Sequence, residues 1–219
     1  MEMTPERWAA TTAYVEEVFG DPDDLLAGLP ARAEAAGLPR WEISPDVGRL
    51  LSILLATTPA RRVLEIGTLG GYSGIWLARG LAPGGRLVTI ERDIAHADFA
   101  AERFAEAGVG HRVEIVRGEA LDVLPGVAES LGPGSVDLVF VDAAKEEYPD
   151  YVALTRYLVA PGGYLVLDNC LGTGSSWIDD RSDPGMAAVD EANRALAGDP
   201  SFDTVALTVR QGVLVARRR

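Results

Sequence analysis

The chain has 219 residues, of which 47% are hydrophobic and 24% are charged, a composition typical of a globular protein rather than of a disordered chain. Its formal net charge of -13 disfavours binding to the phosphates of nucleic acids, since the only basic cluster is Arg217 to Arg219. The single cysteine, Cys170, excludes an internal disulfide framework, and there is neither an apolar span of about 18 residues nor a signal-peptide pattern. We therefore expect one cytoplasmic domain over residues 1–219 that binds neither nucleic acid nor membrane.

The N-terminal segment, residues 1–42, is predicted to form a helical cover or a dimer arm rather than a separate domain, and the core is predicted to span residues 43–219. Ser44 suits the N-cap of a helix, and Pro45 suits its first position. These signals predict a helix from Pro45 to about Thr57.

From Arg61 onward, short β-type runs alternate with segments of helical periodicity. Five runs are rich in aliphatic and β-branched residues: Arg62 to Ile66, Arg86 to Ile90, Arg112 to Val116, Val136 to Val141 and Tyr164 to Leu167. This alternation predicts βαβ units and a parallel sheet with helices on both faces. The predicted fold class is therefore α/β, with a doubly wound, Rossmann-like sheet.

The end of the chain departs from this alternation. A helix is predicted from about Gly185 to Ala197, followed by two β-type runs, Asp203 to Val209 and Gln211 to Arg217, with almost no residues between them. A tight turn of this kind joins antiparallel strands. We therefore expect a seven-stranded, mostly parallel sheet that ends in an antiparallel C-terminal hairpin.

Polar residues stand at the places where the predicted strands end. They are Glu65 and Gly67, then Glu91, Gly118 to Ala120, Asp142, and Asp168 with Asn169. In an open parallel sheet, ligands bind outside the carboxyl ends of the strands, near the switch in strand order. We therefore predict a binding site at this edge. For each acid taken alone, a solvated strand end or a turn is an equally good interpretation.

The turn after the first strand favours a nucleoside cofactor without phosphates. It reads Gly67-Thr68-Leu69-Gly70-Gly71, and Leu69 stands where a dinucleotide fingerprint needs its second glycine. Glu91, at the end of the second strand, is suited to the two ribose hydroxyls. An acidic pocket would also favour the ammonium and sulfonium groups of S-adenosylmethionine.

Two acidic stretches after the fourth and fifth strands indicate a divalent cation. Asp142, Asp168 and Asn169 offer three oxygen ligands, and Lys145 stands at the same strand end as Asp142. Mg²⁺ prefers about six oxygens in a near-octahedral shell, and Mn²⁺ or Ca²⁺ also accepts such ligands. The two vicinal hydroxyls of a catechol would fill two further positions. Turn or cap chemistry is the alternative for either stretch alone.

Several motifs, in order along the chain, resemble the metal-dependent O-methyltransferases, a family that includes catechol and caffeoyl-CoA O-methyltransferases. The motifs are Ile43-Ser44-Pro45-Asp46-Val47-Gly48, Val63-Leu64-Glu65-Ile66-Gly67, Gly71-Tyr72-Ser73, Phe140-Val141-Asp142-Ala143-Ala144-Lys145 with Tyr148, Gly162-Gly163 and Asp168-Asn169. The resemblance covers the chain from about Trp41 to the C-terminus. Departures from the usual pattern at Ala144, Cys170, Gly172 and Gln211-Gly212 concern selectivity more than chemistry.

The resemblance implies roles for the matched residues. Contacts with S-adenosylmethionine would come from Ile43, Glu65, Gly67, Thr68, Tyr72, Ser73, Glu91, Ala120 and Asp142. The resemblance also implies that Asp142, Asp168 and Asn169 hold Mg²⁺ and that the protein is a homodimer. Lys145 would be the general base, with Asp142 as the second catalytic residue. The alternative for Lys145 is an exposed ion pair with the glutamates that follow it.

Other residues carry weaker signals. Trp41 and Trp177 are candidates for the walls of an aromatic-substrate pocket, whereas Trp76 has the helical spacing of a core residue. Cys170 is most simply a small buried hydrophobe. The polar, glycine-rich stretch Gly172 to Arg181 is predicted to gate the substrate, or else to be an exposed connection without a role.

These expectations combine into one hypothesis: an S-adenosylmethionine-dependent, divalent-metal-dependent O-methyltransferase that acts on a hydroxyl of a phenolic, catechol-like or caffeoyl-like small molecule. A nucleotide-dependent oxidoreductase is the second hypothesis, and a non-catalytic S-adenosylmethionine-binding module is the third. Methylation of DNA or protein is a weaker alternative, since the acidic charge disfavours nucleic acid and no Asn-Pro-Pro turn is present.

Overall fold

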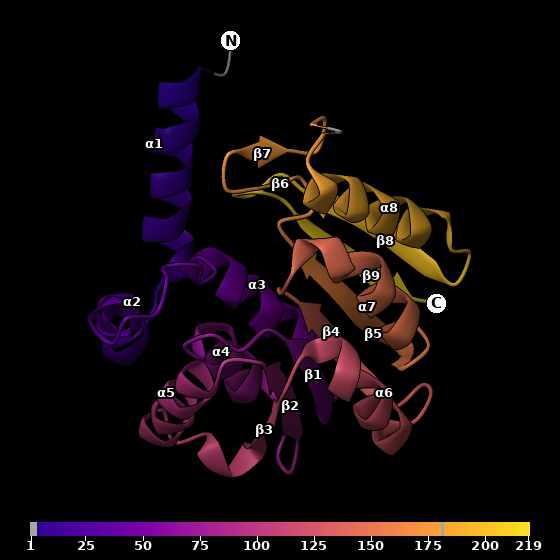
Figure 1. The fold of residues 1–219 in the computed structure, drawn as a ribbon. Coiled ribbons are helices and arrows are strands. Elements are labelled where there is room, and N and C mark those ends of the chain that lie inside the picture. Colours follow the sequence, from indigo (N-terminus) through magenta and orange to yellow (C-terminus); the bar gives the residue numbers. More distant parts are fainter. Residues whose placement is uncertain (1–3, 181) are drawn as a thin grey trace.

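The structure, a computed structural model, describes residues 4–180 and 182–219, and its centre is a seven-stranded sheet (Figure 1). The strands are β1 Arg62–Ile66, β2 Arg86–Glu91, β3 Val113–Arg117, β4 Val136–Val141, β5 Val159–Asp168, β8 Phe202–Leu207 and β9 Val213–Arg218. Their order is β3-β2-β1-β4-β5-β9-β8. The first five in this order are parallel, whereas β9 runs antiparallel to both β5 and β8. The order therefore reverses between β1 and β4.

Helices lie before the first strand and between later strands. The α-helices are α1 Pro5–Val15, α2 Asp24–Ala35, α3 Pro45–Ala56, α4 Tyr72–Gly80, α5 Ile94–Glu106, α6 Ala120–Leu131, α7 Tyr148–Thr155 and α8 Pro184–Gly198. Shorter helical turns are a π-helix at Glu16–Gly20 and 3₁₀ turns at Gly110–Arg112 and Lys145–Glu147. Within residues 4–180 and 182–219, no helix has both the length and the apolar character needed to cross a membrane.

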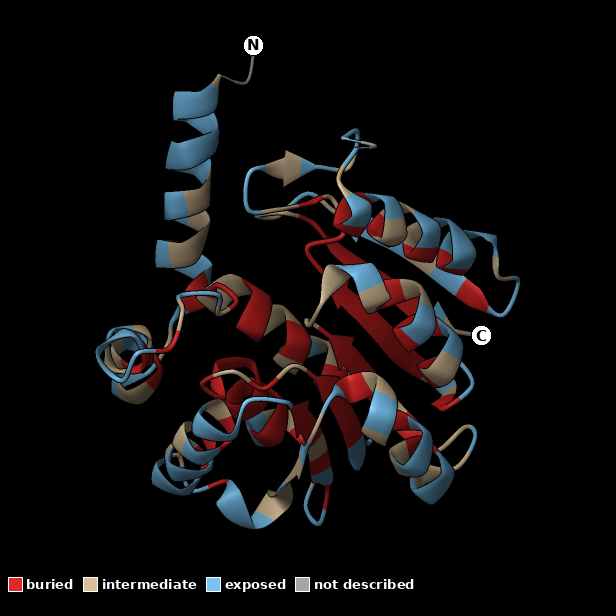
Figure 2. Cartoon of the chain, viewed as in Figure 1, coloured by how far each residue is buried: buried red, intermediate tan, exposed pale blue. Residues whose placement is uncertain are grey.

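Neighbouring residues of each strand face opposite helical layers. Val63, Leu138 and Val166 belong to an apolar cluster with α2, α3, α4 and α5. Leu64 and Val139 belong to a second cluster with α6, α7 and α8. Figure 2 shows the central strands buried along most of their length, whereas the helices carry exposed outer sides. The sheet lies between two helical layers because its parallel strands have no solvent-facing side.

The two N-terminal helices differ in how they are held. α2 buries Leu26, Leu29 and Ala33 in the first apolar cluster. α1 buries none of its residues, and Figure 1 shows it projecting beyond the sheet. Thr4 caps α1 by accepting a hydrogen bond from the backbone N–H of Arg7 at 3.4 Å.

The C-terminal strands pair as predicted, but the connection between them is longer. The sequence predicted one strand that ends at Val209 and another that begins at Gln211. The first observed strand ends at Leu207 and the second begins at Val213, so each is two residues shorter at the connection. The ladder is interrupted because Arg210 and Gly212 have positive φ angles of 49° and 87°. The antiparallel hairpin is confirmed, and residues 208–212 form a loop rather than a tight turn.

Two other differences concern local structure. β5 begins at Val159 rather than at Tyr164, because a register shift next to Val136 lets the start of the strand pair with β4. Ser44 occupies the N-cap of α3 as predicted, but its hydroxyl makes no capping bond, so Pro45 and the backbone start this helix. The other predicted bounds agree with the structure within one residue.

The predicted gating loop contains a small hairpin that the sequence analysis did not identify. β6, Gly172–Thr173, pairs antiparallel with β7, Ser176–Trp177. A Cβ at Gly172 would lie 2.4 Å from the indole of Trp177, so the hairpin depends on this glycine. Arg181, the last residue of the predicted loop, lies outside the described residues.

Gly48 of α3 should resist substitution because α4 packs closely against it. A Cβ there would lie 2.4 Å from Cδ1 and Nε1 of Trp76. We expect Gly48→Ala to lower the free energy of unfolding by about 1–3 kcal/mol, the usual cost of overpacking. Gly28→Ala in α2 is a matched control that should be neutral or stabilising, since no described atom lies within 4 Å of its Cβ position and alanine favours helix. Urea denaturation measures both, and equal stability of the two variants would contradict the packing argument.

Candidate active site

The carboxyl ends of the parallel strands open into a cleft of about 1020 Å³. Most of the predicted site residues line it: Ile43, Gly67, Thr68, Tyr72, Ser73, Glu91, Ala120, Asp142, Lys145 and Asn169. The other two, Glu65 and Asp168, are buried, with 0% and 2% of their surface exposed. The structure therefore brings all twelve predicted residues to one edge of the sheet, ten at the surface of the cleft and two behind it.

The glycine turn after β1 is held against both neighbouring strands. Gly67 has a φ of 99°, and a Cβ there would lie 2.0 Å from the backbone oxygen of Asp142, so a larger residue does not fit. One oxygen of Glu91 accepts hydrogen bonds from the backbone N–H groups of Thr68 and Leu69, at 3.2 and 2.8 Å. The carboxylate at the end of β2 therefore stabilises the turn that lines the cleft.

Glu65 carries a buried carboxyl group that two hydroxyls satisfy. Ser73 Oγ donates to Oε1 at 2.5 Å, and Thr89 Oγ1 donates to Oε2 at 2.7 Å. Burial raises the pKa of Glu65 to about 7, despite the two hydrogen bonds, and the charges of Asp142 and Glu91 add to the increase. Since Ser73 lines the cleft, its hydroxyl links the buried carboxyl group to the cleft surface.

Lys145 is the only lysine in the chain and lies among oxygen atoms. Its Nζ lies 2.9 Å from Oδ1 of Asp142 and donates to the Tyr148 hydroxyl at 2.7 Å. The Tyr148 hydroxyl donates in turn to the backbone oxygen of Asp168 at 2.9 Å. Burial, followed by repulsion from Asp142 and Asp168, raises the pKa of Tyr148 well above its ordinary value. A carboxylate and a neutral phenol therefore position the amine.

Asp168 and Asn169 follow β5 at the same edge. Oδ2 of Asp168 lies 3.4 Å from Nη1 of Arg210. Burial and the nearby charge of Asp142 raise the pKa of Asp168 to about 7. The side-chain amide of Asn169 donates to Oε1 of Gln211 at 2.8 Å, which leaves its carbonyl oxygen as the atom available for a ligand.

The donor set formed by Asp142, Asp168 and Asn169 is suited to a hard cation. Among the residues that the structure describes, no three His, Cys, Asp or Glu side chains form a metal-binding group. The candidate set instead combines two carboxylates with one amide oxygen. Mg²⁺ and Ca²⁺ prefer oxygen ligands of these types and leave further positions to water or substrate. A cation would also relieve the repulsion between the two carboxylates.

Comparison with known proteins identifies the family. A family model described as O-methyltransferase matches residues 17–219. The chain belongs to the O-methyltransferase family. A catechol O-methyltransferase from Mycobacterium tuberculosis is 40% identical over 195 residues, which cover 89% of this chain and 86% of that protein.

Two solved structures resemble this O-methyltransferase over nearly its whole length. The O-methyltransferase from Bacillus cereus, in complex with SAH, has a TM-score of 0.87 and 36% identity and covers 98% of this chain and 99% of its own. TomG from Streptomyces achromogenes, an O-methyltransferase involved in tomaymycin synthesis and solved with SAM, has a TM-score of 0.86 and 38% identity over 99% of both chains. The α/β fold predicted from the sequence is therefore confirmed.

Several residues near the cleft had no role in the sequence analysis. Tyr148 was noted only as part of a motif, although its position three residues after Lys145 is a spacing at which helical side chains meet. His96 of α5 lines the cleft, with Nδ1 3.7 Å from Oε1 of Glu91. Arg210 and Gln211 lie on the β8–β9 loop, whose course no local pattern indicates. Of these residues, only Tyr148 could therefore have been identified from its spacing in the sequence.

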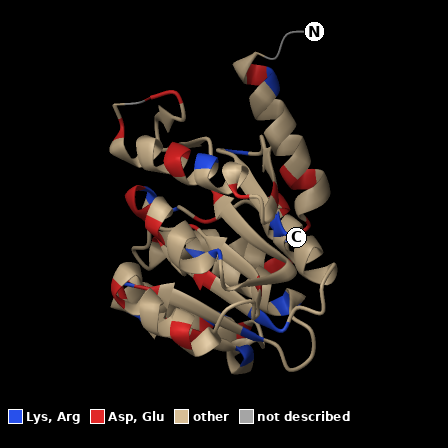
Figure 3. Ribbon diagram, turned by 90° about the vertical axis from the view of Figure 1, so that its right-hand side faces the viewer, with Lys and Arg blue, Asp and Glu red and all other residues tan. Residues whose placement is uncertain are grey.

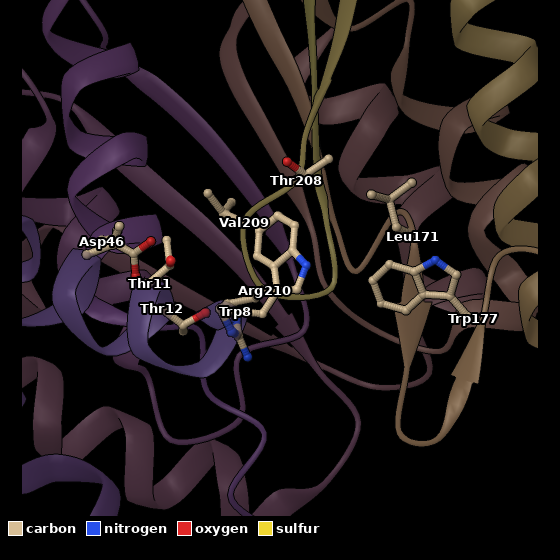
Figure 4. Close-up of a pocket in the computed structure, with 10 residues that line it drawn as sticks. Trp8, Thr11, Thr12, Asp46, Leu171, Trp177, Thr208, Val209 and Arg210 are labelled. Atoms are coloured by element: carbon tan, nitrogen blue, oxygen red, sulfur yellow. The ribbon is translucent and has the colours of Figure 1, made fainter. Parts of the chain in front are cut away.

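A second cavity, of about 640 Å³, adjoins the cleft at Arg210, which lines both (Figure 4). Trp177, one of the two predicted substrate walls, lines this second cavity. Trp41, the other, lines the cleft and is 71% exposed. Cys170 is buried, and burial raises the pKa of its thiol to about 12, so it behaves as a small, unreactive hydrophobe.

The raised pKa of Glu65 predicts a pH-dependent stability. The ordinary pKa of a glutamate is 4.5. Between this pH and about pH 7, the folded protein keeps a proton on Glu65 that the unfolded chain releases. This group therefore stabilises the fold at low pH, and the contribution is lost as the pH rises through that window. As the pH rises through this window, the unfolding free energy of the unmodified protein should fall by an amount on the order of 3 kcal/mol relative to that of Glu65→Gln.

Denaturation of both proteins at several pH values measures this difference. Asp168 titrates in the same range, but it is present in both proteins and so cancels. Glu102→Gln on the exposed side of α5 is the control and should show no such trend. A difference between Glu65→Gln and the unmodified protein that stays constant with pH would contradict the raised pKa.

Proposed function

We propose that this chain is an S-adenosylmethionine-dependent, divalent-metal-dependent O-methyltransferase whose acceptor is a hydroxyl of a catechol-like small molecule. The observation that carries the proposal is the Lys145–Asp142 contact, which lies between the glycine turn and the Asp168–Asn169 pair. The names of the relatives support it, since one is a catechol O-methyltransferase and two structures hold SAH or SAM. Figure 3 shows acidic residues on many helices and loops, which disfavours a nucleic acid acceptor.

The cofactor would lie along the turn after β1 and reach the end of β2. The proposed contacts are Ile43, Gly67, Thr68, Tyr72, Ser73, Glu91, Ala120 and Asp142, with Glu65 acting through the Ser73 hydroxyl. Glu91 still has lone pairs for the ribose hydroxyls, although it accepts backbone hydrogen bonds. The acids at this edge favour the ammonium and the sulfonium of the cofactor.

The metal would be held by Asp142, Asp168 and Asn169, with Mg²⁺ as the first candidate and Mn²⁺ or Ca²⁺ as alternatives. When bound, a divalent cation supplies positive charge that lowers the pKa of a coordinated hydroxyl and fixes its orientation. Gln211 supports this arrangement because its Oε1 accepts a hydrogen bond from the side-chain nitrogen of Asn169. The side-chain oxygen of Asn169 is then available to the metal.

Lys145 would accept the proton of the reacting hydroxyl. A cation held by Asp142 would compete with Nζ for the Asp142 carboxylate, which would leave the Lys145 nitrogen available to the reacting hydroxyl. Tyr148 accepts one hydrogen bond from Nζ and so holds the nitrogen beside the cleft. The acceptor oxygen then bonds to the methyl carbon while the carbon–sulfur bond breaks. S-adenosylhomocysteine leaves as a neutral thioether, and the proton remains on Lys145.

Other interpretations are less well supported. Membership of the O-methyltransferase family favours methyl transfer over the hydride transfer of an oxidoreductase. A non-catalytic binding module would not need a lysine held between a carboxylate and a phenol. The homodimer, the cytoplasmic location and the division into a cover over residues 1–42 and a core over residues 43–219 stay predictions.

Removal of the metal should abolish methylation of catechol. We expect EDTA to lower kcat by at least about 100-fold and Mg²⁺ to restore it, because the cation activates the hydroxyl. Asp168→Asn should have a similar effect, since it removes one ligand charge. Asp98→Asn, which changes an exposed acid that pairs with Arg117, is the control with the same chemistry. Full activity of metal-free enzyme, or of Asp168→Asn, would rule out the metal mechanism.

Lys145 should be required as a base and not only as a positive charge. Lys145→Arg keeps the charge but cannot release a proton at neutral pH, whereas Lys145→Met removes both. We expect both variants to lower kcat by about 10²–10⁴-fold, the usual contribution of general acid–base catalysis. Binding of S-adenosylhomocysteine, measured by calorimetry, should change little. Near-normal kcat in Lys145→Arg would show that the charge alone is sufficient.

A further inference from the structure

The turn that begins at Asn169 has a strained backbone. Asn169 has a φ of 54°, in the left-handed region that side chains other than glycine rarely adopt. The turn ends at Gly172, whose backbone N–H lies 3.4 Å from the Asn169 oxygen, a long and therefore weak bond. Asparagine tolerates the left-handed region better than most residues, but this tolerance does not select one conformation. Other contacts must therefore fix the direction of the Asn169 side chain.

The β8–β9 loop holds one side of this turn. The backbone N–H of Cys170 donates to the oxygen of Gly212 at 3.0 Å. The backbone N–H of Leu171 donates to the oxygen of Gln211 at 2.8 Å. A Cβ at Gly212 would lie 2.5 Å from Cγ of Leu171 and 2.9 Å from Sγ of Cys170, so the loop and the turn are in direct contact. The loop therefore fixes the N–H groups of both residues.

Asn193 of α8 holds the other side of the turn. Its side-chain nitrogen donates to the backbone oxygen of Cys170 at 2.7 Å. A carbonyl oxygen can only accept, so the nitrogen of the amide must face it. The Cys170 oxygen and the Leu171 N–H belong to one planar peptide group and point in opposite directions. This peptide group is therefore held by α8 at one end and by the loop at the other.

The bond to Cys170 is the main effect of the Asn193 side chain. Its Oδ1 is buried and has no hydrogen-bond partner among the described residues, which is unfavourable. Asparagine in a helix is also less favourable than alanine. An alanine at this position would remove both penalties together with the hydrogen bond. Asn193 therefore adds little to the stability of the fold, and its effect falls on the turn that carries Asn169.

We propose that Asn193 is a positioning residue for the divalent cation, because it fixes the turn that places the Asn169 oxygen at the candidate metal site. This inference rests on the proposed function, since Asn169 is one of the three proposed ligands. The backbones of the other two, Asp142 and Asp168, are bonded to β1 and paired with β9, so the sheet itself holds them. Asn169 alone among the three depends on contacts outside the sheet.

Binding of Mn²⁺ to the metal-free protein tests the proposal without catalysis, and the electron paramagnetic resonance signal of the free ion measures it. We expect Asn193→Ala to weaken Mn²⁺ binding by about 10-fold, a usual effect for residues that support metal ligands. Asn193→Leu keeps the shape of the side chain without its donor and should have the same effect. Binding of S-adenosylhomocysteine should stay within about 3-fold, and the unfolding temperature within about 4 °C, of the unmodified protein.

Two further variants serve as controls. Ser135 precedes β4 at the opposite edge of the sheet, and its Oγ donates to the backbone oxygens of Leu131 and Gly132 at 2.7 and 2.8 Å. Ser135→Ala loses the same kind of bond far from the site and should bind Mn²⁺ normally. Asn169→Gly keeps the left-handed conformation but supplies no side-chain oxygen. It should fold and should bind Mn²⁺ at least as weakly as the Asn193 variants.

The outcomes separate the inference from the proposed function. Normal Mn²⁺ binding in both Asn193 variants, together with weaker binding in Asn169→Gly, would overturn the role of Asn193 alone. An equal loss of S-adenosylhomocysteine binding in the Asn193 variants, or a much larger fall in their unfolding temperature, would show a general structural role and would also overturn it. Normal binding in Asn169→Gly, or no binding by the unmodified protein, would contradict the metal site and the inference with it.

Discussion

The pairing of β1 with β4 determines where the chemistry can occur. The strand order reverses at this pair, so the connections that leave the two strands diverge and open the cleft between them. The backbone N–H of Asp142 donates to Ile66 at 2.9 Å, and the missing side chain of Gly67 lets the turn lie directly against the Asp142 carbonyl. The glycine turn and the backbone of Asp142, whose carboxylate lies beside Lys145, are thus in contact. Their relative position is a property of the sheet and does not depend on mobile loops.

The burial of acids at this edge is a second constraint, and it follows from the first. The net charge of the chain is -13, so general neutralisation by surrounding bases does not stabilise these carboxylates. Each one is stabilised by specific donors: hydroxyls at Glu65, Arg210 at Asp168 and Lys145 at Asp142. Burial, together with the remaining repulsion between the carboxylates, raises the pKa values of Glu65 and Asp168. Positive charge that enters the cleft is therefore favoured by acids already in place.

The sheet and its carboxyl edge could be predicted because both depend on local patterns. Continuous apolar runs indicate buried parallel strands, and residues that end such strands share one edge wherever the helices pack. Arg210 and Trp8 could not be predicted, since one lies on a loop with positive φ angles and the other depends on the direction in which α1 projects. The role of Glu65 could be predicted only in part. Its place at a strand end follows from the pattern, but its burial behind Ser73 depends on how α4 begins.

The cleft and the second cavity are built from different parts of the fold. The candidate site residues follow central strands, whereas Trp8 and Trp177, which line the second cavity, come from a projecting helix and a short hairpin. An isolated helix as short as α1 is marginal in water, and α1 gains no stability from buried residues. Contacts that fill the second cavity would therefore stabilise the position of α1, since Trp8 and Val15 of this helix line it. Substitutions on α1 and the hairpin can therefore change the second cavity at little cost to the core, whereas substitutions between β1 and β4 change the cleft and the stability together.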